Sequence, residues 1–258
     1  MTRPIPIPTF TDNLCYLQPC GGDRALVVDP GDAAVVLDAL AKRQRRVEAI
    51  LLTHQHWDHV AGAAELRSQS RCQVIGVDRS LIPACDHVTS DGQTLTLGDL
   101  RMTVIATPGH TRASVCYLVR SNVGDEPGVV YTGDTLFVSG CGRLLECDAA
   151  TMWESLQRLA ALPAETLVFC GHDYALENCE FAVATAPADR RFRDRLAQVE
   201  RAVEYGQPTV PSTIAQERAA NIFLRANDPH VKEALGMANA SPQEVLAELR
   251  RRKDSFAT

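Results

Sequence analysis

Short apolar runs separated by polar turns fill the first two thirds of this chain. The runs 25–28 (Ala-Leu-Val-Val) and 49–52 (Ala-Ile-Leu-Leu) are continuous, which is typical of strands buried on both faces. Between them, residues 33–46 place apolar residues at helical spacing and end in a basic tail that suits the negative end of a helix dipole. A second helix is expected to begin within 60–66. Strands are predicted at 13–17, 25–28, 49–52, 72–76, 95–100, 102–106, 114–119, 129–132 and 166–170.

The pattern changes after residue 172, where helical spacing replaces the strands. The last predicted helix begins with Ser241-Pro242-Gln243-Glu244, a capping box with proline at the first helical position. This change predicts two domains, residues 1–174 and residues 175–258. Helices are expected at 177–183, 190–205, 212–224, 230–237 and 241–253.

Composition narrows the class of protein. The chain has 258 residues, 45% of them hydrophobic, and a net charge of −6, which argues against a nucleic-acid-binding surface. Its nine cysteines are an odd number without a C-x-x-C pair, so we expect free thiols and a reducing compartment. The first eight residues lack the apolar core of a signal peptide, and no apolar run reaches membrane-spanning length. The cytoplasm is the expected location.

The segment 53–59 (Thr-His-Gln-His-Trp-Asp-His) carries the strongest chemical signal. It lies between a predicted buried strand and a predicted helix. Imidazole and carboxylate groups bind divalent zinc, iron or manganese. His54 and His56 are two residues apart, so they point the same way in an extended segment, whereas Asp58 and His59 lie one turn further on. Two pairs of ligands on one short segment suggest two metal ions sharing one site.

Three later strands also end in a residue that can bind metal. His110 follows a Pro-Gly turn, and Asp134 and His172 each follow a glycine. Loops at one edge of a sheet are where α/β scaffolds place their chemistry. Any one of these residues alone would be equally well explained by a structural role, but together with the segment 53–59 they predict a metal site.

These motifs resemble the metallo-β-lactamase superfamily, which is characterised by T-H-x-H-x-D-H, as at 53–59, and by the later histidines and aspartate. The likeness extends to the glyoxalase II (hydroxyacylglutathione hydrolase) family and runs essentially end to end. It implies an α+β fold, a four-layer αβ/βα sandwich followed by a small all-helical domain. The segments that carry the closer resemblance are 134–143, 171–174, 208–213, 221–225 and 250–254.

The resemblance implies a role for each candidate residue. Asp58 and Asp134 would be catalytic, acting with a hydroxide that bridges two divalent ions, with zinc expected and iron or manganese as alternatives. Leu145 stands where some members have a tyrosine that contacts glutathione, and Arg143 stands where some have lysine. The implied ligands are His54, His56 and His110 for one metal, Asp58, His59 and His172 for the other, and Asp134 between them. The implied glutathione contacts are Arg143, Tyr174, Arg250 and Lys253.

The implied reaction is hydrolysis of S-D-lactoylglutathione, and of related S-2-hydroxyacylglutathiones, to D-lactate and glutathione, the second step of methylglyoxal detoxification. A thiol has a pKa near 8.5, so a thiolate can leave without an obligatory general acid. The expected protein is a monomer whose partner is this small thioester, and neither a nucleic acid nor a membrane.

Other functions fit part of the sequence. An iron-dependent glutathione persulfide dioxygenase shares the fold and the first motif, but it needs one metal and lacks a long helical C-terminus. A lactonase or a β-lactamase fits the metal ligands and leaves the basic segment 250–253 unexplained. That segment is also consistent with a solvated last helical turn that complements the helix dipole. A non-enzymatic binding module would be expected to have lost a ligand, and all seven are present.

Overall fold

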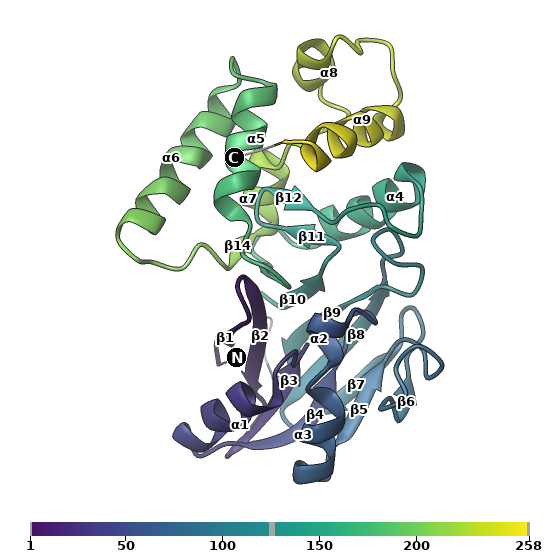
Figure 1. Ribbon diagram of the computed structural model, residues 1–258, viewed down its shortest axis with the longest axis vertical. Helices are drawn as coiled ribbons and strands as arrows, with labels where there is room; N and C mark the ends of the chain where they lie inside the picture. Colours follow the sequence, from purple (N-terminus) through teal and green to yellow (C-terminus); the bar gives the residue numbers. More distant parts are fainter. Residues whose placement is uncertain (1, 124–126, 257–258) are drawn as a thin grey trace. The chain divides into compact units, whose positions relative to one another are not determined.

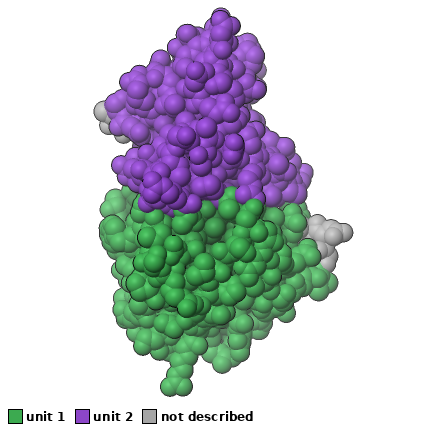
Figure 2. Space-filling model, turned by 90° about the vertical axis from the view of Figure 1, so that its right-hand side faces the viewer, with its two compact units in different colours: residues 1–106, 113–133 green, residues 107–112, 134–258 purple. Residues whose placement is uncertain are grey.

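The computed structural model describes residues 2–123 and 127–256 (Figure 1). The chain divides into two compact units, coloured separately in Figure 2. Unit 1 comprises residues 1–106 and 113–133, and unit 2 comprises residues 107–112 and 134–258.

The first sheet of unit 1 has the strand order β1-β2-β3-β4-β5-β6. The first three strands pair antiparallel, and the pairs from β3 to β6 are parallel. Helices α1 (Ala33–Lys42) and α3 (Ala63–Ser70) pack on one face of this sheet and close an apolar core. The strands are β1 (Ile5–Thr9), β2 (Asn13–Pro19), β3 (Arg24–Val28), β4 (Arg46–Leu51), β5 (Gln73–Gly76) and β6 (His87–Val88).

Four antiparallel strands form the second layer of unit 1, in the order β10-β9-β8-β7. Two buried tyrosines link this layer to the first sheet. Tyr117 of β9 donates to the carbonyl oxygen of Leu52 at 2.8 Å, and Tyr131 of β10 donates to Gln18 Oε1 at 3.0 Å. The strands are β7 (Thr94–Leu97), β8 (Leu100–Ala106), β9 (Val115–Ser121) and β10 (Val129–Gly133).

Unit 2 is mainly helical, as the pattern after residue 172 predicts (Figure 1). The predicted capping box at Ser241 is confirmed. The predicted helix 212–224 is instead a short strand followed by a shorter helix. The elements are β11 (Leu136–Phe137), β12 (Gly140–Cys141), α4 (Ala149–Ala160), β13 (Leu167–Cys170), α5 (Ala175–Thr185), α6 (Arg190–Glu204), β14 (Ser212–Thr213), α7 (Ile214–Ala220), α8 (Pro229–Leu235) and α9 (Pro242–Asp254).

Two helices of unit 1 differ from their predictions. The helix expected at 33–46 ends at Lys42, because Gln44 turns the backbone at φ 51° and Arg46 already begins β4. The helix expected from residue 60 is two helices, α2 (Trp57–Val60) and α3, which begins after Gly62. A Cβ at Gly62 would lie 2.6 Å from the backbone nitrogen of Ala33, so glycine permits the close approach at this break.

None of the helices in the ranges described has the length and apolar character of a membrane span.

Candidate metal centre

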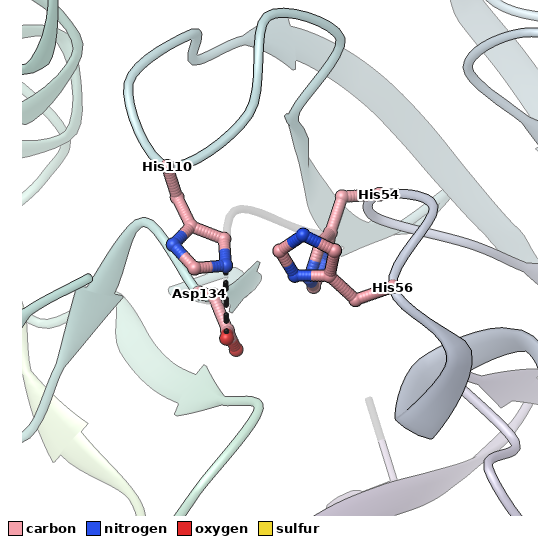
Figure 3. A group of neighbouring side chains, drawn as sticks. All are labelled: His54, His56, His110 and Asp134. Atoms are coloured by element: carbon pink, nitrogen blue, oxygen red, sulfur yellow. Dashed lines mark hydrogen bonds and ion pairs between the residues drawn. The ribbon is translucent and has the colours of Figure 1, made fainter. Parts of the chain in front are cut away.

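The histidines of the segment 53–59 converge within unit 1. His54 and His59 are buried, and His56 is partly exposed. His54 Nε2 lies 3.1 Å from His56 Nδ1, and the rings of His54 and His59 are 4.3 Å apart. His59 belongs to α2, whereas His54 and His56 lie in the loop after β4 (Figure 3). The strand end and the first helical turn together bring three imidazoles into one place.

Asp29 orients this group, although it belongs to none of the sequence motifs that predict the metal site. It follows β3, beside the parallel strand β4, and it is buried. Its carboxylate accepts hydrogen bonds from Thr53 N at 2.8 Å and Thr53 Oγ1 at 2.7 Å, and its Oδ2 lies 3.1 Å from His59 Nδ1. A carboxylate at Nδ1 fixes the tautomer and leaves Nε2 as the nitrogen that can bind a metal. The sequence feature that could have indicated this role is the position of Asp29, an acid directly after the strand that pairs with β4.

Asp58 is held by a second polar contact within unit 1. Asn13, the first residue of β2, donates from Nδ2 to Asp58 Oδ2 at 2.8 Å. Asp58 Oδ2 also lies 3.6 Å from His59 Nε2. The two groups of the second predicted ligand pair therefore face each other.

The three later candidates meet within unit 2. His110 Nε2 lies 3.3 Å from Asp134 Oδ2 (Figure 3), and His172 Nε2 lies 3.5 Å from Asp134 Oδ1. Each oxygen of one carboxylate thus faces a different imidazole, as expected of a residue that contributes to two metal sites. The carbonyl oxygen of Arg143 lies 2.9 Å from His110 Nδ1 and orients its ring in the same way that Asp29 orients His59.

Aromatic side chains fix the ring of His172. Tyr174 stacks on it with ring centroids 4.9 Å apart and an interplanar angle of 6°. Phe137 meets both rings edge-on, at 6.0 Å from His172 and 5.3 Å from Tyr174. Tyr174, a predicted substrate contact, therefore lies directly beside a predicted metal ligand.

The basic C-terminal turn is packed rather than uniformly solvated. Arg250 is only 6% exposed, and its Nη1 donates to the carbonyl oxygen of Cys141 at 2.9 Å. Its Nη2 pairs with Asp254. Exposed Arg251 and partly exposed Arg252 both pair with Glu248, so these two neighbours behave as a solvated helix end.

Lys253 is half-buried on the same helix. Its Nζ donates to the carbonyl oxygen of Glu177 at 3.1 Å and lies 5.8 Å from the centre of the Phe181 ring. Burial, and then the neighbouring charge of Arg250, lower the pKa of Lys253. The predicted substrate residue Arg143 is exposed. Leu145, which stands where some family members have a tyrosine, is exposed as well.

The fold and these ligand-bearing loops define a member of the metallo-β-lactamase superfamily, whose family model matches residues 8–172. The structure of ETHE1 from Myxococcus xanthus is similar, with a TM-score of 0.65 and 25% identity over 96% of this chain and 89% of that one. TTHA1623 in a di-iron-bound form gives a TM-score of 0.53 and 28% identity over 66% of this chain and 92% of that one.

Within the superfamily, the chain belongs to the hydroxyacylglutathione hydrolase family. The family model described as the C-terminus of hydroxyacylglutathione hydrolase matches residues 173–256. A hydroxyacylglutathione hydrolase of Methylococcus capsulatus is 42% identical over 260 residues, covering 99% of each chain. The predicted family and the predicted α+β fold of the metallo-β-lactamase superfamily are thus confirmed, and the chain is a metal-dependent hydrolase.

Proposed function

We propose that this chain hydrolyses S-D-lactoylglutathione and related S-2-hydroxyacylglutathiones to glutathione and the free 2-hydroxy acid, the second step of methylglyoxal detoxification. The observation that carries the proposal is the match of residues 173–256 to the C-terminus of hydroxyacylglutathione hydrolases, together with the superfamily match of residues 8–172. A persulfide dioxygenase or a lactonase would share the second match without requiring the first.

We propose two divalent metal ions, with zinc as the expected metal. Imidazoles and carboxylates suit zinc, iron and manganese alike, and the di-iron form of TTHA1623 supports iron as an alternative. When bound, such ions lower the pKa of water and polarise a carbonyl oxygen. The proposed ligands are the ones that the family resemblance implies: His54, His56 and His110 for one ion, Asp58, His59 and His172 for the other, and Asp134 for both.

The chain's own residues prepare these ligands. Asp29 holds His59, Asn13 holds Asp58, and the carbonyl oxygen of Arg143 holds His110. Because Asp29 and the Arg143 carbonyl oxygen engage Nδ1 of His59 and His110, Nε2 of each ring is left to bind a metal. A thiol has a pKa near 8.5, so the thiolate can leave without an obligatory general acid. We propose Asp58 and Asp134 as the catalytic residues.

We propose that Arg143, Tyr174, Arg250 and Lys253 bind the glutathione part of the substrate. Glutathione carries two carboxylates and one ammonium, so its excess negative charge suits arginine and lysine. Arg250 is the least accessible of the four, and its counter-ion Asp254 is exposed. We propose that a substrate carboxylate replaces Asp254 at this guanidinium.

The proposal includes a cytoplasmic monomer with domains at 1–174 and 175–258. All nine cysteines are free thiols, which is typical of a reducing compartment. The family match that begins at residue 173 supports a domain boundary close to 174.

The proposed function is tested by offering the purified protein S-D-lactoylglutathione, a lactone, a β-lactam and glutathione persulfide. We expect thiol release from the thioester to be the fastest reaction by a wide margin. Oxygen consumption with the persulfide that exceeds thioester hydrolysis would instead support the dioxygenase.

Replacing Lys253 with alanine should raise KM for S-D-lactoylglutathione about tenfold with little change in kcat. A charge-assisted contact that is remote from the thioester contributes equally before and during the reaction. The effect should disappear for a small thioester that lacks the glutathione carboxylates. Arg251→Ala, which removes an exposed charge on the same helix, is the matched control. The same loss on both substrates would mean that Lys253 does not recognise glutathione.

A further inference from the structure

A short hairpin in unit 2 leads from the proposed metal ligand Asp134 to Arg143, whose carbonyl oxygen faces the proposed ligand His110. It consists of β11 and β12, residues 136–141, and begins two residues after Asp134. At its far end, a Cβ on Gly142 would lie 1.9 Å from the carbonyl oxygen of Asp134, so the chain returns against that residue. The next carbonyl, that of Arg143, is the one that orients His110. A shift of the hairpin would therefore move the backbone at Asp134 and the partner of His110 together.

The turn of this hairpin has an uncommon backbone conformation. Ser139 is buried and lies at φ 57°, in the left-handed region that residues with a Cβ seldom adopt. Such a conformation persists only where surrounding groups hold it. The backbone nitrogen of Ser139 donates to Glu217 Oε2 at 2.8 Å, and Glu217 is itself only 1% exposed.

Two asparagines complete the support of the turn. Asn221, at the end of α7, donates from Nδ2 to the carbonyl oxygen of Gly140 and to Glu217 Oε2, both at 2.9 Å. Asn178 of α5 donates to the carbonyl oxygen of Val138 at 3.1 Å. Both asparagines are buried. Polar side chains of α5, of α7 and of the residue after α7 thus hold three consecutive residues of the hairpin backbone, Val138, Ser139 and Gly140. Figure 1 shows these helices beside the hairpin.

Glu217 lies at the centre of this arrangement, although burial of its carboxyl group is unfavourable. Burial raises the pKa of its carboxyl group, while hydrogen bonds from its neighbours oppose the shift. An acid that served only to pack α7 could be replaced by an apolar residue of similar size. Its hydrogen bonds instead go to the hairpin turn and to the asparagine that supports the same turn.

We propose that Glu217 is a positioning residue for the metal centre. By accepting from Ser139 N, it fixes the turn of the hairpin, and the hairpin then sets Asp134 and the carbonyl oxygen that orients His110. The helical segment would on this account contribute to metal binding as well as to substrate recognition. The inference rests on the proposed metal centre.

The test compares Glu217→Ala with Glu217→Gln in the full chain, using zinc affinity from competition with a chelator and the Tm of the metal-free protein. Loss of an outer-shell partner commonly weakens metal binding about 10- to 100-fold, and we expect Glu217→Ala to lower zinc affinity by about tenfold. Glutamine keeps an acceptor for Ser139 N–H, so Glu217→Gln should retain most of the affinity. In Glu217→Ala, kcat should fall more than KM rises.

Two further variants separate positioning from general stability. Asn178→Ala removes only the bond to Val138 and should cause a smaller loss of zinc affinity, which keeps the test decisive if Glu217→Ala does not fold. Asp189→Ala removes a buried partner of Arg225 elsewhere among the helices, and should lower Tm without changing zinc affinity.

Zinc affinity equal to wild type in Glu217→Ala and Asn178→Ala, with lowered Tm alone, would overturn the proposal and leave the proposed function standing. A wild-type protein that does not bind zinc, iron or manganese would instead contradict the metal centre itself.

Discussion

Replacing Asp134 with alanine is expected to lower kcat/KM for S-D-lactoylglutathione by more than about a hundredfold and to reduce bound metal. Outer-shell residues already change metal affinity about 10- to 100-fold. Asp134 should matter more, because its two oxygens face His110 and His172 separately, at 3.3 and 3.5 Å. Removing this one carboxylate would take a ligand from both proposed ions.

The measurement is metal content and turnover on the same sample of Asp134→Ala. Asp194→Ala is the control, because Asp194 is an exposed acid on α6 that pairs with Arg190. It should behave as wild type in both assays. An Asp134→Ala protein with full metal content and undiminished turnover would rule out a bridging role for this residue.

The second large effect is expected for Asp29→Asn. The carboxylate accepts from Thr53 and also faces His59 Nδ1, so it requires a proton on that nitrogen. An amide nitrogen placed at Oδ2 would donate to Nδ1 instead, and His59 would carry its proton on Nε2, where a metal cannot bind. We expect zinc affinity to fall about 10- to 100-fold.

The Tm of metal-free Asp29→Asn distinguishes this tautomer effect from unfolding. Asparagine keeps nearly the same shape and one acceptor for Thr53, so the metal-free variant should lose little stability. Asp29→Ala should lose more, because Thr53 would retain buried donors without their acceptor, at about 1–3 kcal/mol. Unchanged zinc affinity in Asp29→Asn would show that Asp29 is only a structural anchor.

Candidate residues that follow a predicted strand could be identified from the sequence. His54, His110, Asp134 and His172 follow apolar runs directly or after a short turn, and the structure brings them to strand or loop ends within their units. Which nitrogen of a histidine is engaged depends on distant partners such as Asp29, so the local pattern could not reveal it.

Some elements were missed for identifiable physical reasons. Strand β1 alternates isoleucine and proline, a pattern that excludes a central strand but is tolerated here because β1 pairs only with β2 at the sheet edge. Helix α4 is different: it was missed although its sequence carries a helical signal, since Met152, Leu156 and Leu159 follow helical spacing after the capping residue Asp148.

Glu217 shows where local patterns fail entirely. An acid inside a predicted helix is usually solvated, and its sequence neighbours give no sign that Ser139, far away along the chain, needs an acceptor. The same holds for Arg250, whose basic neighbours suggest a solvated helix end although its side chain is buried against Cys141 and Phe223.

We propose that this family member works as a dinuclear metal hydrolase of glutathione thioesters. The most direct measurement is titration of zinc into the metal-free protein while turnover of S-D-lactoylglutathione and bound zinc are followed together. We expect activity to rise from near zero and to reach its maximum at about two ions per chain. Full turnover at one ion per chain, or turnover that persists without metal, would rule out a dinuclear hydrolase.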